Sequence, residues 1–166
     1  MGEIWELVDG NERKTGMEIE RGTNTPIPHG MYHMAVDIWT KSKDGKILLT
    51  QRHPDKDWPL YWECSGGSLV KGESIVSGAQ RELQEETGII VPEDKLDYLG
   101  KTVMPEYQCI MHTFMVRLER DVTLKLQSDE VIGAKWVDIS ELEAMKEKIV
   151  ESVWRRYLQF KNRLIR

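Results

Sequence analysis

The segment GSLVKGESIVSGAQRELQEETGI, from Gly67 to Ile89, carries the most specific pattern in this sequence. Its second half has the local features of a helix. Ser74 is a good residue to cap the start, Gly88 suits the left-handed position after the last turn, and Pro92 prevents the helix from continuing. The segment therefore predicts a loop followed by a helix and a second loop.

Three carboxylates of this helix, those of Glu82, Glu85 and Glu86, are spaced three and four residues apart and fall on one face. Like charges at this spacing repel one another and weaken an isolated helix, so they need a compensating partner. Mg²⁺ is a natural candidate, because it takes oxygen ligands and is usually held by a few carboxylates together with substrate phosphates. A solvated acidic face is the alternative, and the Glu-Glu pair by itself favours it.

The complete spacing is more specific than the charge run, because nine positions are specified over 23 residues. It resembles the Nudix box, the loop-helix-loop signature of the Nudix hydrolase superfamily. The matching positions are Gly67, Glu73, Arg81, Glu82, Leu83, Glu85, Glu86, Gly88 and Ile89. The resemblance implies a hydrolase that uses Mg²⁺, or Mn²⁺, to cleave a diphosphate linkage in a nucleoside-diphosphate derivative or another organic diphosphate.

On the family pattern, Glu85 and Glu86 are the main metal ligands, and the carbonyl of Gly66 is a further one. Glu82 either binds metal or acts as the general base, and Arg81 orients it through an ion pair. Some family members instead place the base on a loop outside the box. Glu130 is the candidate for that role here, although a lone acidic residue is often only an exposed loop carboxylate. Glu73 could be purely structural, since its charge favours a helix start.

The remaining pattern predicts the α/β/α sandwich of this family, with a mixed central β-sheet and an amino-terminal β-hairpin. We expect one Nudix domain over residues 1–166: the hairpin and a loop in 1–30, the box in 67–89, and a carboxy-terminal helical region in 140–166. Ser140 and Glu143 form a capping box for that region. The predicted strands cover residues 4–8, 14–20, 33–40, 46–52, 96–103, 107–118 and 131–137. In several Nudix proteins such an amino-terminal hairpin helps to form a homodimer.

Composition restricts the class of protein. The chain has 166 residues and a net charge of −5, with an apolar fraction ordinary for a globular domain. No apolar run is long enough to span a membrane, and the first residues do not resemble a signal peptide. Cys64 and Cys109 have no metal-ligand spacing, so we expect free thiols and a cytoplasmic location. Residues 146–166 are basic, but the acidic main body argues against a nucleic-acid polymer as partner.

A second resemblance concerns type 1 isopentenyl-diphosphate isomerase and its hydrolase relatives. It rests on the segments Trp58-Pro59-Leu60-Tyr61-Trp62, Tyr32-His33-Met34-Ala35 and Asp129-Glu130-Val131, the last followed by Trp136. The isomerase needs a catalytic Cys, a metal-binding His and a pair of Glu; these align with Gly66, Ser68, Tyr107 and Cys109. An enzyme without its acid and base cannot transfer the proton, so a hydrolase is favoured and the isomerase is an alternative.

Two further questions are left open by the sequence. A regulatory module that binds a phosphorylated ligand without turnover is another alternative, although the intact box argues against it. Trp58, Tyr61 and Trp62 could stack on a nucleobase or enclose an isoprenoid chain, but packing is the commoner role. The four histidines show no paired metal spacing, so they predict no histidine metal site. Only His33, which belongs to a segment that resembles the isomerase, is kept as a candidate site residue.

Overall fold

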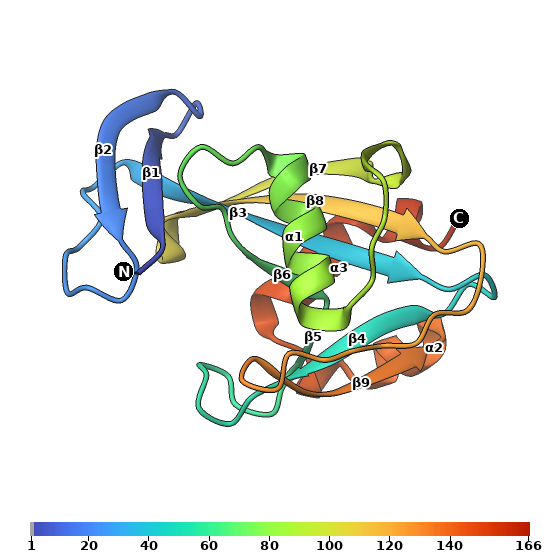
Figure 1. Ribbon diagram of the computed structural model, residues 1–166. Helices are drawn as coiled ribbons and strands as arrows, with labels where there is room; N and C mark the ends of the chain where they lie inside the picture. The colour runs from blue at the N-terminus through green and yellow to red at the C-terminus, as the bar shows by residue number, and fades with distance from the viewer. Residues whose placement is uncertain (1) are drawn as a thin grey trace.

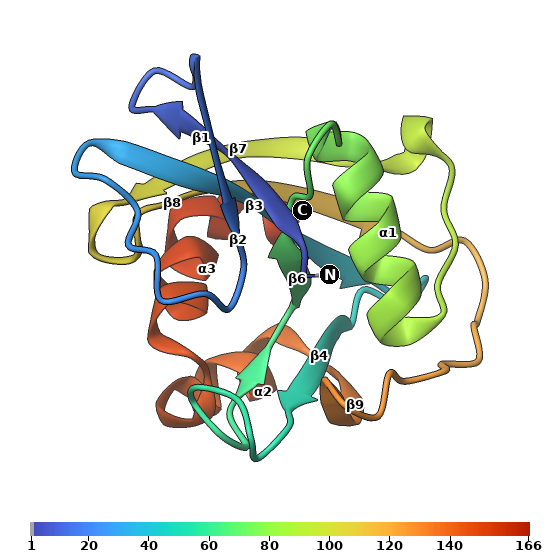
Figure 2. The same cartoon turned by 60° about the vertical axis from the view of Figure 1, so that its left-hand side comes forward.

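Strand β3 (Met31–Lys41) is the central element of the fold. The computed structural model describes residues 2–166 and has strands between helices on two sides (Figures 1 and 2). The other strands are β1 (Ile4–Asp9), β2 (Lys14–Glu20), β4 (Ile47–Arg52), β5 (Trp62–Glu63), β6 (Ser65–Ser68), β7 (Asp97–Met104), β8 (Cys109–Arg117) and β9 (Val131–Val137). The helices are α1 (Ile75–Thr87), α2 (Ile139–Ala144) and α3 (Glu151–Leu164), with short 3₁₀ turns at Glu93–Lys95, Pro105–Tyr107 and Lys146–Lys148.

The pairing of β3 makes the sheet mixed, as predicted. Along one edge β3 runs parallel to β8, and along the other it runs antiparallel to β6. Its pairing with β4 is confined to Lys41 and Ile47, beyond which β4 pairs with β5 and β9 instead. The sheet therefore divides between β6 and β4, and residues of both strands line a polar cavity.

The two faces of β3 pack against different helices because its side chains alternate. Val36 and Ile38 join a core cluster with Ala79 and Leu83 of α1. Trp39 faces the other way and joins a cluster with Tyr157 of α3. Complete burial of a side chain such as Leu83 contributes roughly 1.5–3 kcal/mol, so α1 is held firmly against the sheet. The α/β/α arrangement is thereby confirmed (Figure 2).

Helix α1 begins and ends where its sequence predicts. Ser74 is the N-cap: its hydroxyl accepts the backbone N–H of Ser77, and the Ser77 hydroxyl accepts the N–H of Ser74 in return. Gly88 follows the last turn with φ 75°, and its N–H donates to the carbonyl of Gln84. A left-handed residue at this position is easiest for glycine, so the C-terminal end of the helix is fixed by its sequence.

The amino-terminal hairpin is also confirmed, and it joins the sheet. Val8 pairs with Tyr32 at the start of β3, and the indole of Trp5 stacks on the His33 ring at 4.1 Å between centroids. The hairpin therefore lies beside the start of β3, at one end of the sheet (Figure 1). The homodimer remains a prediction.

Three local expectations were wrong or incomplete. The α2 cap is Asp138, not Ser140, because the Asp138 carboxylate accepts the N–H of Glu141 and the helix starts two residues earlier than a Ser140 cap implies. Glu143 is instead bound by the Tyr157 hydroxyl. Strand β8 starts at Cys109, later than predicted, since Pro105–Tyr107 forms a 3₁₀ turn. Strands β5 and β6 were not predicted from the glycine-rich sequence. Within residues 2–166, no helix combines the length and apolar character needed to span a membrane.

Candidate active site

Arg81 of α1 lies at the centre of a network of carboxylates. Its Nε and Nη2 bind the two oxygens of Glu73 at 2.7 and 2.9 Å. Its Nη1 binds Glu82 Oε1 at 2.7 Å and Glu85 Oε2 at 3.1 Å, and Nη2 also donates to the Ser68 carbonyl at 3.0 Å. These contacts fasten the loop before the helix to the helix itself. The predicted ion pair between Arg81 and Glu82 is present in the structure.

Glu73 precedes the cap of α1 and acts within the loop. One of its oxygens accepts the backbone N–H of Val70 at 3.1 Å, while both bind Arg81. Burial raises the pKa of Glu73, but the hydrogen bonds from Arg81 and Val70 outweigh it, and the net pKa is lowered. Glu73 is therefore held as a carboxylate that fixes the loop, which agrees with the structural alternative for this residue.

Gly67 makes room for the carboxylate of Glu82. A Cβ atom at Gly67 would lie 2.4 Å from Glu82 Oε1, far inside a normal contact. Glu82 is buried, and burial raises its pKa while the charge of Arg81 opposes the rise. The glycine thus allows a charged side chain of α1 to lie directly against the backbone of β6.

Glu86 is the most deeply buried carboxylate of the box, with 4% of its surface exposed. Within residues 2–166 its Oε2 has no hydrogen-bond partner. Its pKa is raised well above the ordinary value, first by burial and then by the negative charges of Glu63 and Glu82. A buried carboxylate oxygen without a donor, beside two other carboxylates, is the environment that a hard cation would stabilise.

Glu63, at the end of β5, was missed by sequence reasoning. Arg52 Nη1 lies 2.9 and 2.8 Å from its two oxygens, and burial raises the Glu63 pKa. The residue lies outside the box and has no acidic neighbour in sequence, so only its place three positions before Gly66 could have indicated it. The structure brings it to the Glu86 carboxylate through the pairing of β5 with β4.

The donor set fits a divalent cation such as Mg²⁺ or Mn²⁺ in its chemistry. Carboxylate oxygens and a backbone carbonyl are the ligands that such ions prefer. Within residues 2–166 Glu86 Oε2 has no hydrogen-bond donor, and a bound cation would take the place of that donor. Across residues 2–166 no three side chains are already clustered as a metal-binding set. Glu82 and Glu85 are instead bound to Arg81, and the Glu85 side chain is 48% exposed.

Glu130, the second candidate base, forms an ion pair with Lys56. The same Lys56 charge favours the ionised forms of Glu63 and Glu86, so it lies within electrostatic reach of all three carboxylates. The backbone carbonyl of Glu130 also accepts the N–H of His53 at 3.0 Å. The loop before β9 is thereby joined to the loop that follows β4, and Glu130 is placed at the edge of the carboxylate group.

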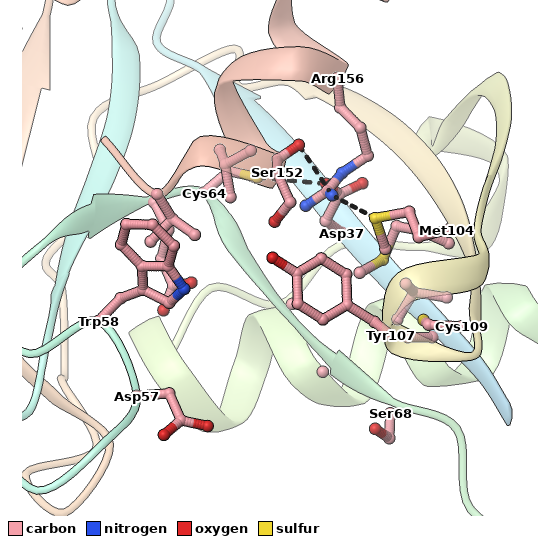
Figure 3. A pocket seen from close by; sticks show the side chains of 18 of the residues that line it. Asp37, Asp57, Trp58, Cys64, Ser68, Met104, Tyr107, Cys109, Ser152 and Arg156 are labelled. Atoms are coloured by element: carbon pink, nitrogen blue, oxygen red, sulfur yellow. Dashed lines mark hydrogen bonds and ion pairs between the residues drawn. The ribbon is translucent and has the colours of Figure 1, made fainter. Parts of the chain in front are cut away.

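A cavity of about 310 Å³ adjoins these carboxylates (Figure 3). Its lining includes Glu63, Gly66, Gly67 and Ser68, together with Asp37, which pairs with Gly66 across β3 and β6, and Arg156 of α3. Three further cationic side chains and two aromatic side chains also line the cavity. They are Arg21, Arg52 and Lys56, with Trp58 and Tyr107. A cavity of this size lies at the lower end of the range for small-molecule sites, about 300–1,000 Å³.

His33 also lines the cavity and is neutral. Burial lowers its pKa from 6.5 to about 4, and its Nδ1 lies 3.0 Å from the carbonyl oxygen of Gln108. Because a carbonyl can only accept, Nδ1 carries the proton and donates. Of the three candidate aromatic residues, Trp58 lines the cavity, whereas Tyr61 and Trp62 pack against the core on the α3 side.

Known proteins resemble this chain in sequence. A family model described as NUDIX domain matches residues 31–158. An uncharacterized Nudix hydrolase of Listeria monocytogenes is 34% identical over 150 residues, covering 87% of this chain and 85% of the relative. An isopentenyl-diphosphate delta-isomerase of Aspergillus fumigatus is 24% identical over 177 residues, covering 87% of this chain and 63% of the isomerase.

Solved structures resemble its fold. A crystal structure of a Deinococcus radiodurans protein has a TM-score of 0.71 at 20% identity, covering 87% of this chain and 89% of that one. A bifunctional NMN adenylyltransferase/ADP ribose pyrophosphatase of Francisella tularensis, complexed with AMP and a Mn ion, has a TM-score of 0.68 at 20% identity. That match covers 84% of this chain and 43% of the bifunctional protein.

Proposed function

The chain belongs to the Nudix hydrolase family, and we propose that it uses Mg²⁺ or Mn²⁺ to hydrolyse a diphosphate linkage in a nucleoside diphosphate derivative or another organic diphosphate. The observation that carries the proposal is the buried, unpartnered carboxylate oxygen of Glu86, beside Glu82 and beside Glu63, which lines the cavity. The Mn ion in the structure of the Francisella tularensis relative supports the choice of metal.

The metal would be held by Glu82, Glu85, Glu86 and the carbonyl of Gly66. When bound, such an ion polarises a phosphoryl group and acidifies a water molecule. Burial of Glu86 removes competing water from its carboxylate, and Gly67 leaves the space that the Glu82 carboxylate needs. Arg81 orients Glu82 and opposes the rise that burial causes in the Glu82 pKa, because it binds Oε1 of that residue at 2.7 Å.

Other residues would act on the substrate directly. Arg21, Arg52 and Lys56 line the cavity and would neutralise phosphate charge, which otherwise repels an attacking water. Glu82 and Glu130 are both retained as the general base. Glu82 is buried beside Arg81, whereas Glu130 is bound to Lys56 and would be released when Lys56 turns to a phosphate.

The isomerase alternative is not favoured by the cavity. Ser68, Tyr107 and Cys109 line it at the positions where the isomerase needs a metal-binding His and two Glu. Burial raises the pKa of the Cys109 thiol to about 12, so this side chain stays protonated and does not replace a carboxylate. We therefore retain hydrolysis as the reaction.

The test is product formation from nucleoside triphosphates, dinucleotides, nucleotide sugars and isopentenyl diphosphate, with Mg²⁺ or Mn²⁺. Glu85→Gln should lower turnover by about 100- to 1,000-fold, the usual effect of removing one charged group that stabilises the transition state. Glu119→Gln, an equivalent change at an exposed carboxylate paired with Lys95, should leave turnover unchanged. Isomerisation of isopentenyl diphosphate, or binding without any metal-dependent product, would show that the proposed reaction is wrong.

A further inference from the structure

The amino-terminal hairpin contacts the loop of residues 69–74, which joins β6 to α1 (Figure 1). The N–H of Lys71 donates to the carbonyl of Ile4 in β1 at 2.8 Å, and the N–H of Gly72 donates to Glu6 Oε2 at 2.9 Å. A third contact joins Lys71 Nζ to Glu18 Oε1 of β2 at 2.6 Å. Both strands of the hairpin therefore bind two consecutive residues of this loop.

The middle of the loop depends on contacts of this kind. Lys71 and Gly72 are exposed and belong to no helix or strand. Gly72 has φ 80°, a left-handed conformation that residues other than glycine adopt at a cost. Exposed turns are among the segments of a protein that open locally at low free energy. The three contacts from the hairpin hold this turn in one conformation.

The loop lies between the groups to which the metal is assigned. Gly66 precedes it in β6, and Glu73 follows Gly72 directly. Glu73 binds Arg81 through both of its oxygens. Arg81 in turn binds Glu82 Oε1 at 2.7 Å. A displacement at Gly72 would therefore be passed to Glu82 through one carboxylate and one guanidinium.

Glu6 is the hairpin residue whose side chain binds the backbone of the loop. Its Oε2 accepts the N–H of Gly72, and its Oε1 accepts a hydrogen bond from Lys14 Nζ at 3.1 Å. The hydrogen bond from Gly72 is the largest cause of the lowered pKa of Glu6. The Lys14 side chain is 73% exposed, and ion pairs at such positions contribute little. The charge-assisted bond to Gly72 is therefore the stronger of the two contacts.

The base of the same hairpin borders the cavity. Arg21 follows β2 and lines the cavity, and its Nη1 lies 2.9 Å from Glu3 Oε2. The N–H of Arg21 also donates to the Glu3 carbonyl at 2.8 Å. Burial raises the pKa of Glu82, and the negative charge of Glu3 adds to that rise, so Glu3 lies within electrostatic reach of the box. The hairpin thus approaches the candidate active site at two places.

We propose that the hairpin braces the loop of residues 69–74 in its own chain, and that Glu6 is a positioning residue for the metal site. The Glu6 carboxylate holds Gly72, and hence Glu73, in place. Arg81 is then held where it presents Glu82 to the ion. This inference rests on the proposed function, because it concerns the same metal site. It gives the hairpin a role within a single chain.

Binding of Mn²⁺, followed by electron paramagnetic resonance, tests the brace without turnover. Glu6→Leu removes the acceptor for Gly72, so we expect the Kd for Mn²⁺ to rise by about 10-fold, as for loss of one charge-assisted hydrogen bond. In Glu6→Gln the amide oxygen can accept the same N–H while the exposed Lys14 loses its partner, so most of the affinity should return. Glu20→Leu is the matched control, because this exposed hairpin carboxylate accepts the N–H of Gly2, and it should leave the Kd unchanged. If Glu6→Gln weakens binding as much as Glu6→Leu does, the effect is one of charge and the brace is wrong.

Amide hydrogen exchange of residues 69–74, measured without metal, separates this inference from the proposed function. Glu6→Leu should speed exchange of the Gly72 amide by about 10-fold, and Glu6→Gln should largely restore its protection. If exchange and the Kd for Mn²⁺ both respond in this way but no diphosphate is hydrolysed, the hydrolase proposal is wrong and the brace is supported. If diphosphates are hydrolysed but Glu6→Leu leaves the Kd unchanged, the brace is wrong and the hydrolase proposal stands. Faster exchange with an unchanged Kd would likewise overturn the positioning role of Glu6.

Discussion

Arg81 of α1 and Arg156 of α3 bind carboxylates on the two sides of the sheet, and the number of their contacts differs. Arg81 binds three carboxylates and a backbone carbonyl, and its side chain is 25% exposed. Arg156 binds one carboxylate and is 3% exposed. At Arg81 the five hydrogen bonds to three carboxylates and one carbonyl use all five N–H groups of the guanidinium. At Arg156, by contrast, Oδ1 of the partner carboxylate Asp37 has no hydrogen-bond donor within residues 2–166.

The comparison predicts that the buried pair is the more sensitive to loss of its arginine. Arg156→Met leaves the buried Asp37 carboxylate without a cation and with only the Cys64 thiol as a donor, so we expect a loss of about 3–5 kcal/mol in the free energy of unfolding. The double variant Asp37→Leu/Arg156→Met removes both charges and should recover most of that loss. Urea denaturation of the unmodified protein and both variants measures the effect.

Arg163→Met is the control, because Arg163 belongs to the same helix and donates only to the backbone carbonyls of Tyr98 and Leu99. It should cost about 1 kcal/mol or less. If the double variant is no more stable than Arg156→Met, the loss comes from packing around α3 and the account of an uncompensated Asp37 charge is wrong.

The same difference explains what the sequence could predict. The partners of Arg81 lie 1 to 13 residues away, so spacing alone places them on one helix and its preceding loop. Asp37 and Arg156 are 119 residues apart and meet only because β3 and α3 pack against each other. Neither residue belongs to a recognisable pattern. For the same reason Glu63 was missed, since its approach to Glu86 depends on the pairing of β5 with β4.

Local chemistry also limited the prediction where two capping residues compete. Asp138 and Ser140 are both good N-caps, and the structure uses Asp138, with the Ser140 hydroxyl donating to its carboxylate. In contrast, Ser74 and Gly88 have no competitors nearby, and the helix between them was predicted within a residue. Trp58 has a left-handed backbone that no sequence pattern indicates, so its place in the cavity required the structure.

His33 shows a third way of burying an ionisable group in this cavity, which is to leave it uncharged. Its pKa is lowered by burial from 6.5 to about 4, so the folded state resists protonation more than the unfolded state does. Its contribution to stability is therefore complete above pH 6.5 and is lost as the pH falls from 6.5 to about 4. Over this interval the loss amounts to about 3 kcal/mol.

Stability measured by urea denaturation at pH 7, 6, 5 and 4 tests this prediction. His33→Asn cannot titrate here but keeps a donor for the Gln108 carbonyl, and it should flatten the pH dependence by most of that amount. His29→Asn, at an exposed position, should leave the dependence as it is. A slope that His33→Asn does not reduce would mean that another group is responsible for the loss.

The smallest expected effect concerns Arg81, and it separates the two arginines by their response to metal. Arg81→Met removes the hydrogen bonds to Glu73 and Glu82, and we expect a loss of about 2 kcal/mol, less than at Arg156 because the site is more exposed. Removing Arg81 also leaves Glu82 and Glu85 without their guanidinium partner, next to the buried Glu86. A cation that binds these carboxylates only in the folded state should then stabilise it, by about 2.7 kcal/mol at 100 times its Kd.

We therefore expect Mg²⁺ to raise the Tm of Arg81→Met toward that of the unmodified protein. The difference in Tm between Arg156→Met and the unmodified protein should not change when Mg²⁺ is added. Arg81→Met/Glu86→Gln is the control, because it lacks the buried carboxylate and should lose the response to Mg²⁺. If Mg²⁺ raises the Tm of Arg81→Met and of this double variant equally, the ion binds elsewhere on the acidic surface. The proposed metal site at Glu82, Glu85 and Glu86 would then be wrong. The description of the buried Asp37–Arg156 pair would be unaffected, because it depends on the unpartnered Oδ1 of Asp37.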